Sequence, residues 1–343
     1  MIIEIELSVK EKNYIMKYLF VLLLLGLTSV VHAQTETAEQ PNCDEIIGFL
    51  YTDFDLVPKD YTGIAFECKD GKVKRLHNYK EGKYDGLCRS WISNGQLVLE
   101  QYYKDAEQDG LSRNWYNNGQ IANEENYKAG KVDGLSRSWY LNGQLKAEEN
   151  FIAGGILHGS WRKWYKNGQL EIEYNYKNGE EDGLCREWFD NGQLREEFPP
   201  RKDGKRNGII RGWHYNGQLR YESNYKDGKG EGLRRAWYEN GALQFEGNWK
   251  DGKQEGSVSQ WHENGQLNLD WNYKDGKKNG LCRGWYENGQ LEYEGNWKDG
   301  ELDGLIKGWH KNGQLEYEYN YKEGAAISEK CFDEDGNLRS CKW

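Results

Sequence analysis

Residues 281–304 read LCRGWYENGQLEYEGNWKDGELDG and hold the pattern that decides the fold. Apolar or aromatic residues alternate with polar ones on both sides of Asn288-Gly289, which is typical of half-buried strands. Asn-Gly between two such segments is the strongest short-range signal for a β-hairpin, because both residues accept positive φ at little cost. The stretch therefore predicts, in order, a strand over Leu281–Tyr286, a tight turn at Glu287–Gly289, a strand over Gln290–Lys298 and a longer Gly-bounded loop over Asp299–Gly304.

The same arrangement recurs along the chain at spacings of 24 or 25 residues. Its Asn-Gly pairs begin at Asn94, Asn118, Asn142, Asn167, Asn191, Asn216, Asn240, Asn264, Asn288 and Asn312. A Trp stands three residues before each of these Asn residues, and a fixed period of this length is the signature of a repeat protein. We therefore predict an all-β fold, an elongated single-layer antiparallel sheet of stacked β-hairpin repeats of 24–25 residues. Each repeat should advance the stack by roughly 10 Å.

Two turn geometries fit the Asn-Gly sequence. A three-residue loop with Gly in the left-handed conformation pairs Trp285 with Leu291, and it places Trp, Leu and Tyr of successive repeats on one face as an aromatic stripe. A two-residue loop inverts that face and sets the recurrent base at Arg283 opposite the recurrent acid at Glu294. We favour the three-residue loop, because burying Trp against Leu outweighs an exposed ion pair worth at most about 1 kcal/mol.

One repeat departs from the pattern at Pro199-Pro200, where the other repeats have Asn followed by an aromatic residue. Proline cannot donate a hydrogen bond to a neighbouring strand. The strand that contains it should therefore shorten, bulge or lie at an edge, and we expect a bend near residues 198–206.

The repeat resembles a known family. The stretch NYKDGKKNGLCRGWYENGQLEYEGNWKDG, residues 272–300, is similar to the bacterial variant of the MORN repeat, and it recurs about eleven times in register. The resemblance implies an extended antiparallel sheet of stacked hairpins. It also implies a role in holding another molecule, since related arrays serve as interaction or scaffold modules.

The N-terminal residues read as an export signal. Residues 16–33, MKYLFVLLLLGLTSVVHA, combine a Lys, an apolar run too short for a comfortable membrane span, and small residues at the cleavage positions. Met16 fits an initiator better than Met1, and the protein should be periplasmic or extracellular. We predict an N-terminal extension and signal peptide over 1–33, a linker or cap over 34–60, the repeat array over 61–327 and a capping hairpin over 328–343.

The chain has 7 Cys, which matters because export implies an oxidising compartment. Cys331 and Cys341 flank the last turn, and a disulfide between them would staple the terminal hairpin. Cys43 and Cys68 are candidates for the same role at the N-terminus. Three further cysteines lie four repeats apart, too far for a disulfide between any two of them in an extended sheet. They are Cys88, Cys185 and Cys282.

Charge and motifs exclude several function classes. The net charge of −10 argues against a nucleic-acid partner and disfavours binding to membrane lipid. His214, His262 and His310 recur every second repeat, about 20 Å apart, which is too far to share a metal ion. No catalytic, cofactor-binding or metal-binding motif occurs, so we expect no enzymatic activity and no cofactor.

The sequence thus predicts an exported, non-enzymatic scaffold that binds a protein partner through a repeated aromatic and acidic surface. Large aromatic and Arg side chains dominate such interfaces. The candidate binding residues are Trp188, Trp213, Trp237, Trp261, Trp285, Arg211, Arg235 and Arg283. Two alternatives remain open: a protein that binds cell-wall or surface glycans, and a structural or self-assembling repeat protein whose sheet edge pairs with another chain. The sequence does not specify the oligomeric state.

Overall fold

A computed structural model describes residues 39–46, 48–50 and 57–341. The chain divides into two units, Met1–Glu39 and Gln40–Trp343, and the elements named below all belong to the second. The predicted N-terminal extension and signal peptide, 1–33, lie outside the described residues. Within the described part, no helix is long and apolar enough to cross a membrane.

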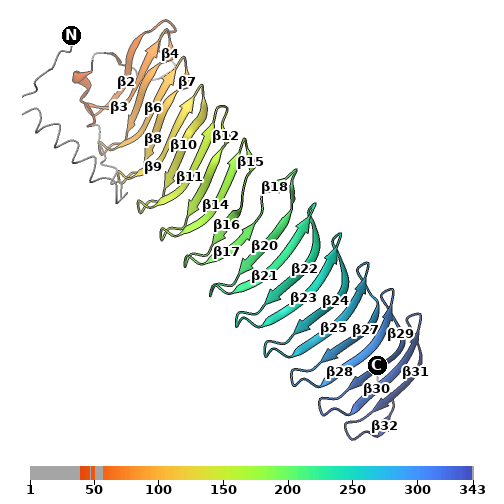
Figure 1. The fold of residues 1–343 in the computed structure, drawn as a ribbon. Coiled ribbons are helices and arrows are strands. Elements are labelled where there is room, and N and C mark those ends of the chain that lie inside the picture. The colour runs from red at the N-terminus through yellow and green to blue at the C-terminus, as the bar shows by residue number, and fades with distance from the viewer. Residues whose placement is uncertain (1–38, 47, 51–56, 342–343) are drawn as a thin grey trace, which may run out of the picture. The chain divides into compact units, whose positions relative to one another are not determined.

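Strands make up nearly all of the second unit (Figure 1). The elements are η1 (Cys43–Glu45), β1 (Phe49–Leu50), β2 (Gly63–Lys69), β3 (Lys72–Lys80), β4 (Lys83–Tyr84), β5 (Gly86–Trp91), β6 (Leu97–Lys104), β7 (Glu107–Gln108), β8 (Gly110–Trp115), β9 (Ile121–Lys128), β10 (Lys131–Trp139), β11 (Leu145–Ile152), β12 (Ile156–Leu157), β13 (Gly159–Trp164), β14 (Leu170–Lys177), β15 (Glu180–Glu181), β16 (Cys185–Trp188), β17 (Leu194–Phe198), β18 (Arg201–Lys202), β19 (Lys205–Arg206), β20 (Gly208–Trp213), β21 (Leu219–Lys226), β22 (Lys229–Trp237), β23 (Leu243–Lys250), β24 (Lys253–Trp261), β25 (Leu267–Lys274), β26 (Lys277–Lys278), β27 (Gly280–Trp285), β28 (Leu291–Lys298), β29 (Glu301–Trp309), β30 (Leu315–Lys322), β31 (Ala325–Phe332) and β32 (Leu338–Arg339).

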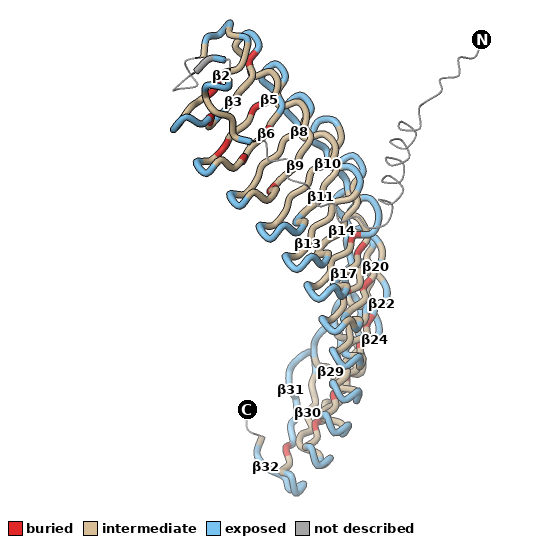
Figure 2. The backbone as a smooth tube through the Cα atoms, turned by 90° about the vertical axis from the view of Figure 1, so that its left-hand side faces the viewer, coloured by how far each residue is buried: buried red, intermediate tan, exposed pale blue. Residues whose placement is uncertain are grey.

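Each long strand pairs antiparallel with the strands before and after it, so the hairpins form one long sheet, as predicted. The exception at the N-terminal end is β1, which runs parallel to β2. Exposed turns recur along the array, and few positions are fully buried (Figure 2). A single layer has no second layer to cover either of its faces.

The Asn-Gly turn has the predicted three-residue form. The amide of Tyr286 donates to the carbonyl of Gln290 at 2.9 Å, so Glu287, Asn288 and Gly289 form the loop. Gly289 has φ of 82°, a left-handed conformation that glycine adopts without steric cost. The Asn288 side chain accepts the amide proton of Gln290 at 3.0 Å and so closes the turn locally.

The opposite turn is tighter than predicted. Lys298 pairs with Glu301, so the connection contains only Asp299 and Gly300, both with positive φ. That conformation is the two-residue type I′ turn, whose twist matches the flanking strands. The loop expected over Asp299–Gly304 is therefore wrong in length: β29 begins at Glu301, and the remaining glycine, Gly304, marks an irregularity inside the strand.

A β-bulge beside the Asn-Gly turn was not predicted. Trp285 pairs with Leu291 and Gly284 pairs with Tyr293, which leaves Glu292 as an extra residue in β28. The following pair is Arg283 with Glu294. The bulge therefore combines two pairings that the sequence presented as alternatives, Trp with Leu and Arg with Glu.

The bulge also corrects the predicted aromatic stripe. A Cβ on Gly284 would meet the ring of Tyr293, so Tyr293 lies on the face of Gly284. Because neighbours in a strand point to opposite faces, Trp285 lies on the other side. Trp and Leu share one face, as predicted, whereas the Tyr expected with them lies on the opposite face. Extra residues in a strand shift all later side chains to the other face.

The two faces differ in composition. We call one side of the sheet the ring face. It carries Tyr293, Cys282, Gly284, Trp297 and their equivalents in other repeats. Most of the buried residues of the array lie here, including Cys185 and Cys282 at 0% exposure and Val258 at 3%. The thiols of Cys88, Cys185 and Cys282 are free.

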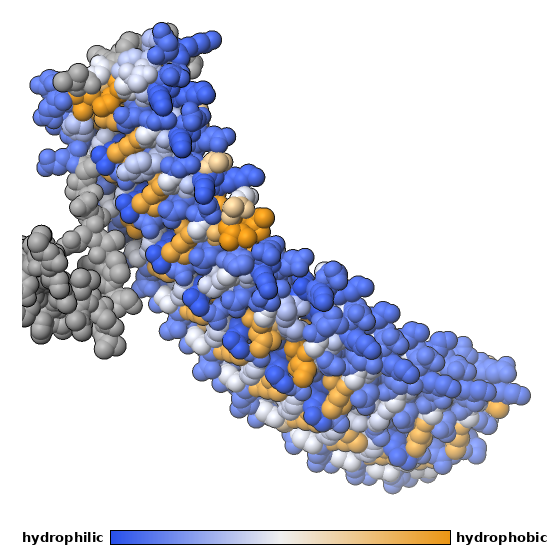
Figure 3. Space-filling view, turned by 45° about the horizontal axis from the view of Figure 1, so that its top comes forward, coloured by the Kyte–Doolittle hydropathy of each residue, from blue (hydrophilic) through white to orange (hydrophobic). Residues whose placement is uncertain are grey.

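We call the other side the ladder face. It carries Trp285, Leu291, Arg283, Glu294 and their equivalents. Leu281 also belongs to it, because it alternates with Cys282. Figure 3 shows hydrophobic patches that recur along the array, each set between hydrophilic side chains.

Both ends of the described array carry a disulfide. Cys331 is bonded to Cys341 with the Cα atoms 5.2 Å apart, and this bond holds the segment after the last turn against β31. Cys43 is bonded to Cys68 and ties η1 to β2. Terminal repeats lack one neighbour, so covalent links stabilise them where packing is incomplete.

The repeat that contains Pro199-Pro200 has a shortened strand. β17 ends at Phe198 after five residues, whereas the equivalent strand β21 has eight. β18 and β19 form a separate two-stranded hairpin beyond the prolines. Proline has no backbone N–H group to donate, which explains why pairing with the main sheet stops there.

Candidate functional site

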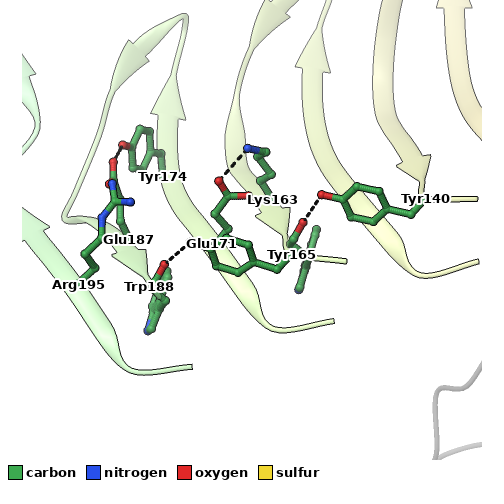
Figure 4. Close-up of polar contacts among 9 residues, drawn as sticks. Tyr140, Lys163, Tyr165, Glu171, Tyr174, Glu187, Trp188 and Arg195 are labelled. Carbon is green, nitrogen blue, oxygen red and sulfur yellow. Dashed lines mark hydrogen bonds and ion pairs between the residues drawn. The ribbon is translucent and has the colours of Figure 1, made fainter. Parts of the chain in front are cut away.

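The residue after each Trp links one repeat to the next. Tyrosine hydroxyls at this position donate to the carbonyl of the Trp in the following repeat at 2.7–2.8 Å. The contacts of Tyr140 and Tyr165 are visible in Figure 4, where the latter reaches Trp188. In other repeats His214 and His262 make the equivalent contact, at 2.8 and 2.9 Å. These side chains fix the spacing of the repeats.

The turn asparagines form a second link between repeats. The amide group of Asn240 donates to the carbonyl of Glu263 at 3.0 Å, and that of Asn264 donates to the carbonyl of Glu287 at 2.8 Å. The contact occurs at every Asn-Gly turn from Asn142 to Asn312. The Asn of each Asn-Gly pair therefore shapes its own turn and holds the neighbouring one.

Arginine and glutamate alternate along the ladder face. In eight hairpins the Arg Nε lies 2.6–2.9 Å from the Glu carboxylate of the same hairpin. Some carboxylates also approach the base of the next repeat, as Glu197 does with Arg211 at 4.0 Å. Lys307 replaces Arg in one repeat, and Ser259 with Asp270 replaces the ion pair in another. We call this row of side chains the ion ladder.

A row of aliphatic side chains runs beside the ion ladder on the same face. Leu184, Ile209, Leu233 and Leu305 occupy the position equivalent to Leu281 and remain 37–44% exposed. Tyr102, which pairs with Leu87 at this position in an earlier repeat, is 39% exposed. We call these residues the apolar row. Asn224 and Asn248 lie opposite Ile209 and Leu233 on the paired strands, so polar amides separate the apolar side chains of the row.

The structure brings the predicted binding residues together on the ladder face. Trp188, Trp213, Trp237, Trp261 and Trp285 are half-buried and stand at the same position in their repeats. Arg211, Arg235 and Arg283 lie beside them and form the ion pairs of the ion ladder with Glu222, Glu246 and Glu294. The apolar row was not among the predicted binding residues, although an aliphatic residue recurs at this position in most repeats.

The ring face is more varied. In the middle repeats it carries polar contacts, such as that of Lys163 with Glu171 at 2.8 Å and that of Glu187 with both Tyr174 and Arg195 (Figure 4). Burial, followed by the hydrogen bond to Glu187, raises the pKa of Tyr174. In later repeats the position of Lys163 and Glu187 is held by Gly212, Ala236, Gln260, Gly284 and Gly308.

Two adjoining hollows lie on the ring face between β21 and β25. The larger has a volume of ≈ 450 Å³, and the smaller has ≈ 180 Å³. Arg234 and Trp249 line both. Neither residue was predicted as part of a site.

The described residues contain no cluster of three or more His, Cys, Asp or Glu that could hold a metal ion. The His residues at the Trp-adjacent position bind main-chain carbonyls instead. Burial raises the pKa of the Cys88 and Cys185 thiols to about 11, which leaves them protonated and unreactive at neutral pH.

Comparison with known families identifies the repeat. The MORN repeat variant matches at residues 84–105, 108–129, 132–153, 157–178, 181–199, 206–227, 230–251, 254–275, 278–299 and 302–323. These matches cover more than half of the chain. The chain belongs to the MORN repeat variant family. Each matched MORN repeat begins at the second residue of the strand that follows the turn between hairpins, and all but the match at 181–199 end in the next such turn, so the register of the family coincides with that of the hairpins. The short match at 181–199 ends at the prolines that shorten β17.

Other comparisons add little to the MORN assignment. No curated protein matches the chain in sequence. Among solved structures, the crystal structure of TcdB2-TccC3-TEV is similar at 12% identity with a TM-score of 0.16, covering 78% of this chain and 19% of that chain. The structures of TcdB2-TccC3 and TcdB2-TccC3-Cdc42 each give 11% identity and a TM-score of 0.13, covering 79% of this chain and 20% of theirs. The MORN array thus spans about a fifth of the length of these chains.

Proposed function

We propose that this MORN repeat protein is an exported, non-enzymatic scaffold that binds a protein partner through its ladder face. The observation that carries the proposal is the apolar row, whose side chains stay 37–44% exposed beside the ion ladder. Apolar anchors next to ordered charges combine affinity with selection of the partner. The signal-like residues 16–33 support export.

Rigidity of the array supports the same proposal. Hydrogen bonds from Tyr, His and Asn side chains fix neighbouring repeats, so a partner that contacts several repeats meets a surface already in place. Binding to a preorganised surface loses less conformational entropy than binding to a mobile one. The half-buried Trp side chains, such as Trp213 and Trp237, add anchors beside the ion ladder.

A crosslinking pull-down from the producing cells tests the proposal, with the chain from Gln34 as bait. The test variant is Ile209→Glu with Leu233→Glu, which places charge in the apolar row at exposed positions where the fold tolerates it. Leu141→Glu is the matched control, because Leu141 is 60% exposed and lies in a turn. A discrete protein captured by the unaltered chain and the control but lost with the double variant supports the proposal. Equal capture by all three baits would overturn it.

Self-association is a second candidate function, supported by the open edge of β31. Residues Ala325–Lys330 pair with β30 on one side, and no described strand pairs with them on the other. Ile327 on this strand is 61% exposed. An unpaired edge can accept a strand from a second copy of the chain. A monomer mass that stays constant with concentration in sedimentation equilibrium would exclude this function.

A further inference from the structure

The hollows on the ring face lie at one place in the array, where two glycines remove side chains. Gly230 stands where the next two repeats have Gln254 and Lys278, and Gly247 stands where the next repeat has Trp271. The indole of Trp249 lies against both glycines, since a Cβ on Gly230 would be 3.6 Å from its ring and a Cβ on Gly247 would be 3.1 Å away. The indole of Trp249 packs on the two glycines, and their missing side chains leave space beside it.

The equivalent space in a later repeat is filled. Lys278 places its ammonium 3.4 Å from the ring centre of Trp271 and 4.5 Å from that of Trp297. No lysine covers Trp249 in this way, because its partner across the sheet is Gln254 and the preceding repeat has Gly230. The nearest cation is Arg234, whose guanidinium lies farther from the ring, at 5.6 Å from its centre. The larger hollow, at ≈ 450 Å³, falls in the range of small-ligand sites.

The lining of the larger hollow combines flat rings with carboxamides. The rings belong to Tyr238, Phe245 and Trp249, and the carboxamides belong to Gln244, Gln254, Gln260 and Asn268. Trp261, whose main-chain carbonyl accepts a hydrogen bond from Tyr238, also borders the hollow. No carboxylate lines it, although the chain carries 56 Asp and Glu. Each carboxamide offers both donors and an acceptor, as a ligand rich in hydroxyl groups requires.

Arg234 supplies the single charge of this lining. Its guanidinium lies 5.6 Å from the ring centre of Trp249, and no hydrogen bond or ion pair of this side chain is recorded within the described residues. The neighbouring Arg235, by contrast, is paired with Glu246 on the ladder face. In the smaller hollow, the carboxylate of Glu231 accepts the amide proton of Asp251 at 3.0 Å and so has a partner of its own. Arg234 is therefore a cation available to a ligand.

We propose that the hollows between β21 and β25 bind an oligosaccharide that carries a carboxylate, such as a uronic-acid glycan. Sugar rings present apolar C–H faces that pack on flat aromatic side chains, and their hydroxyls pair with carboxamides. The guanidinium of Arg234 binds the carboxylate through two parallel hydrogen bonds. A peptide anchor would instead favour aliphatic walls, which this lining lacks. The site lies on the face opposite the ladder face and is independent of the proposed protein partner.

Isothermal titration calorimetry of the full chain with a trimer of galacturonic acid tests this site, with cellotriose as the neutral probe. We expect the uronate trimer to bind with Kd between about 10 μM and 1 mM, and cellotriose to bind at least tenfold more weakly. Arg234→Gln should weaken uronate binding at least tenfold. Arg235→Gln, on the ladder face, is the matched control and should leave binding unchanged.

Gly230→Gln gives a second test that preserves the fold, because it copies the neutral Gln254 at the equivalent position and a Cβ there has ordinary contacts. Gly230 lines the smaller hollow, so the new side chain should weaken uronate binding by filling the space beside Trp249. Absence of uronate binding to the unaltered chain, or binding that persists in both Arg234→Gln and Gly230→Gln, would overturn the proposal. Tighter binding of tetraglutamate than of the uronate trimer would also overturn it, in favour of an acidic peptide.

Discussion

At the scale of single residues, the ring face depends on where glycine stands. Gly284 and Gly308 leave room for the rings of Tyr293 and Tyr317, which lie directly over them. In an earlier repeat Ala236 occupies the same position opposite Phe245. At Gly284 and Gly308 the absence of a side chain leaves the space that the Tyr ring occupies.

This relation predicts the effect of Gly284→Ala. The new methyl group would overlap the ring of Tyr293, so we expect a loss of about 1–3 kcal/mol in the free energy of unfolding. Urea unfolding followed by circular dichroism measures it. The matched change Ala236→Gly should cost no more than about 1 kcal/mol. An unaltered stability of Gly284→Ala would show that Tyr293 does not pack on this position.

The buried thiols predict how stability varies with pH. The pKa of Cys88 and of Cys185 is about 11 in the folded chain against an ordinary value of 9, because burial disfavours the thiolate. The folded state thus binds these protons more tightly than the unfolded state. The stabilisation is complete below pH 9 and is lost as the pH rises through 11.

Urea midpoints measured from pH 8 to 11 in the chain and in Cys88→Ser with Cys185→Ser test this dependence. Serine occupies the same position at Ser112 and Ser136 and does not ionise in this range. We expect the unaltered chain to lose stability more steeply. Parallel curves for the two proteins would contradict the burial of the thiols.

At the scale of strands and hairpins, the ion ladder has one interruption. Ser259 lies between Glu246 and Asp270 across the neighbouring strands, where other repeats place a base. We predict that Ser259→Arg raises the free energy of unfolding by up to about 1 kcal/mol at low salt, because it supplies the missing cation. Thermal unfolding in low and in high salt measures the gain.

Salt separates this electrostatic gain from added packing. The gain should shrink in about 1 M salt, where exposed charges are screened beyond roughly 3 Å. Ser259→Met adds length without charge and should show no salt-dependent gain. A gain in Ser259→Arg that is independent of salt would mean that the charges of the ion ladder do not act together.

The last hairpin depends on its disulfide. Its second strand, β32, has only two residues, so packing alone provides little to hold it. Cys341→Ser should lower local stability by about 3 kcal/mol, the effect expected for closing a short loop. Amide hydrogen exchange should accelerate in β31 and stay unchanged in β22 to β25. Acceleration throughout the array would show instead that the terminal hairpin supports every repeat.

Much of the element-level structure follows from sequence. The ten Asn-Gly pairs with their preceding Trp predict the hairpins, the period and the three-residue turn, because Gly in the left-handed conformation leaves few alternatives. The bulge at Glu292 could not be predicted, because the residue at its position varies without pattern. Equivalent residues include Val98, Ala122, Lys146 and Arg195. A bulge is set by pairing on both sides of a strand, and no residue type marks it.

At the scale of the molecule, the MORN array has two faces with different chemistry. The ladder face repeats nearly unchanged through the ion ladder, whereas the ring face changes from polar contacts in the middle repeats to glycines and rings later. The sequence placed Trp and Arg on one face correctly, since they alternate within a single strand. It placed Tyr wrongly because the bulge intervenes.

The hollows of the ring face are harder to predict from the sequence than the hairpins are. They arise where Gly230 and Arg234 depart from the residues that other repeats have at these positions, and where Gly247, like Gly295, has no side chain. Such departures are visible in an alignment of the repeats. The alignment does not show that all three residues lie beside Trp249, because this depends on the strand register that the bulge sets.

We propose that a protein partner binds the ladder face. Site-specific photo-crosslinking in the producing cells tests this contact, with a benzoylphenylalanine placed at Leu233 in the apolar row or at Gln244 on the ring face of the same hairpin. We expect a crosslink to one discrete protein from position 233 and none from position 244. A protein crosslink from position 244 alone, or from neither position, would rule out binding through the ladder face.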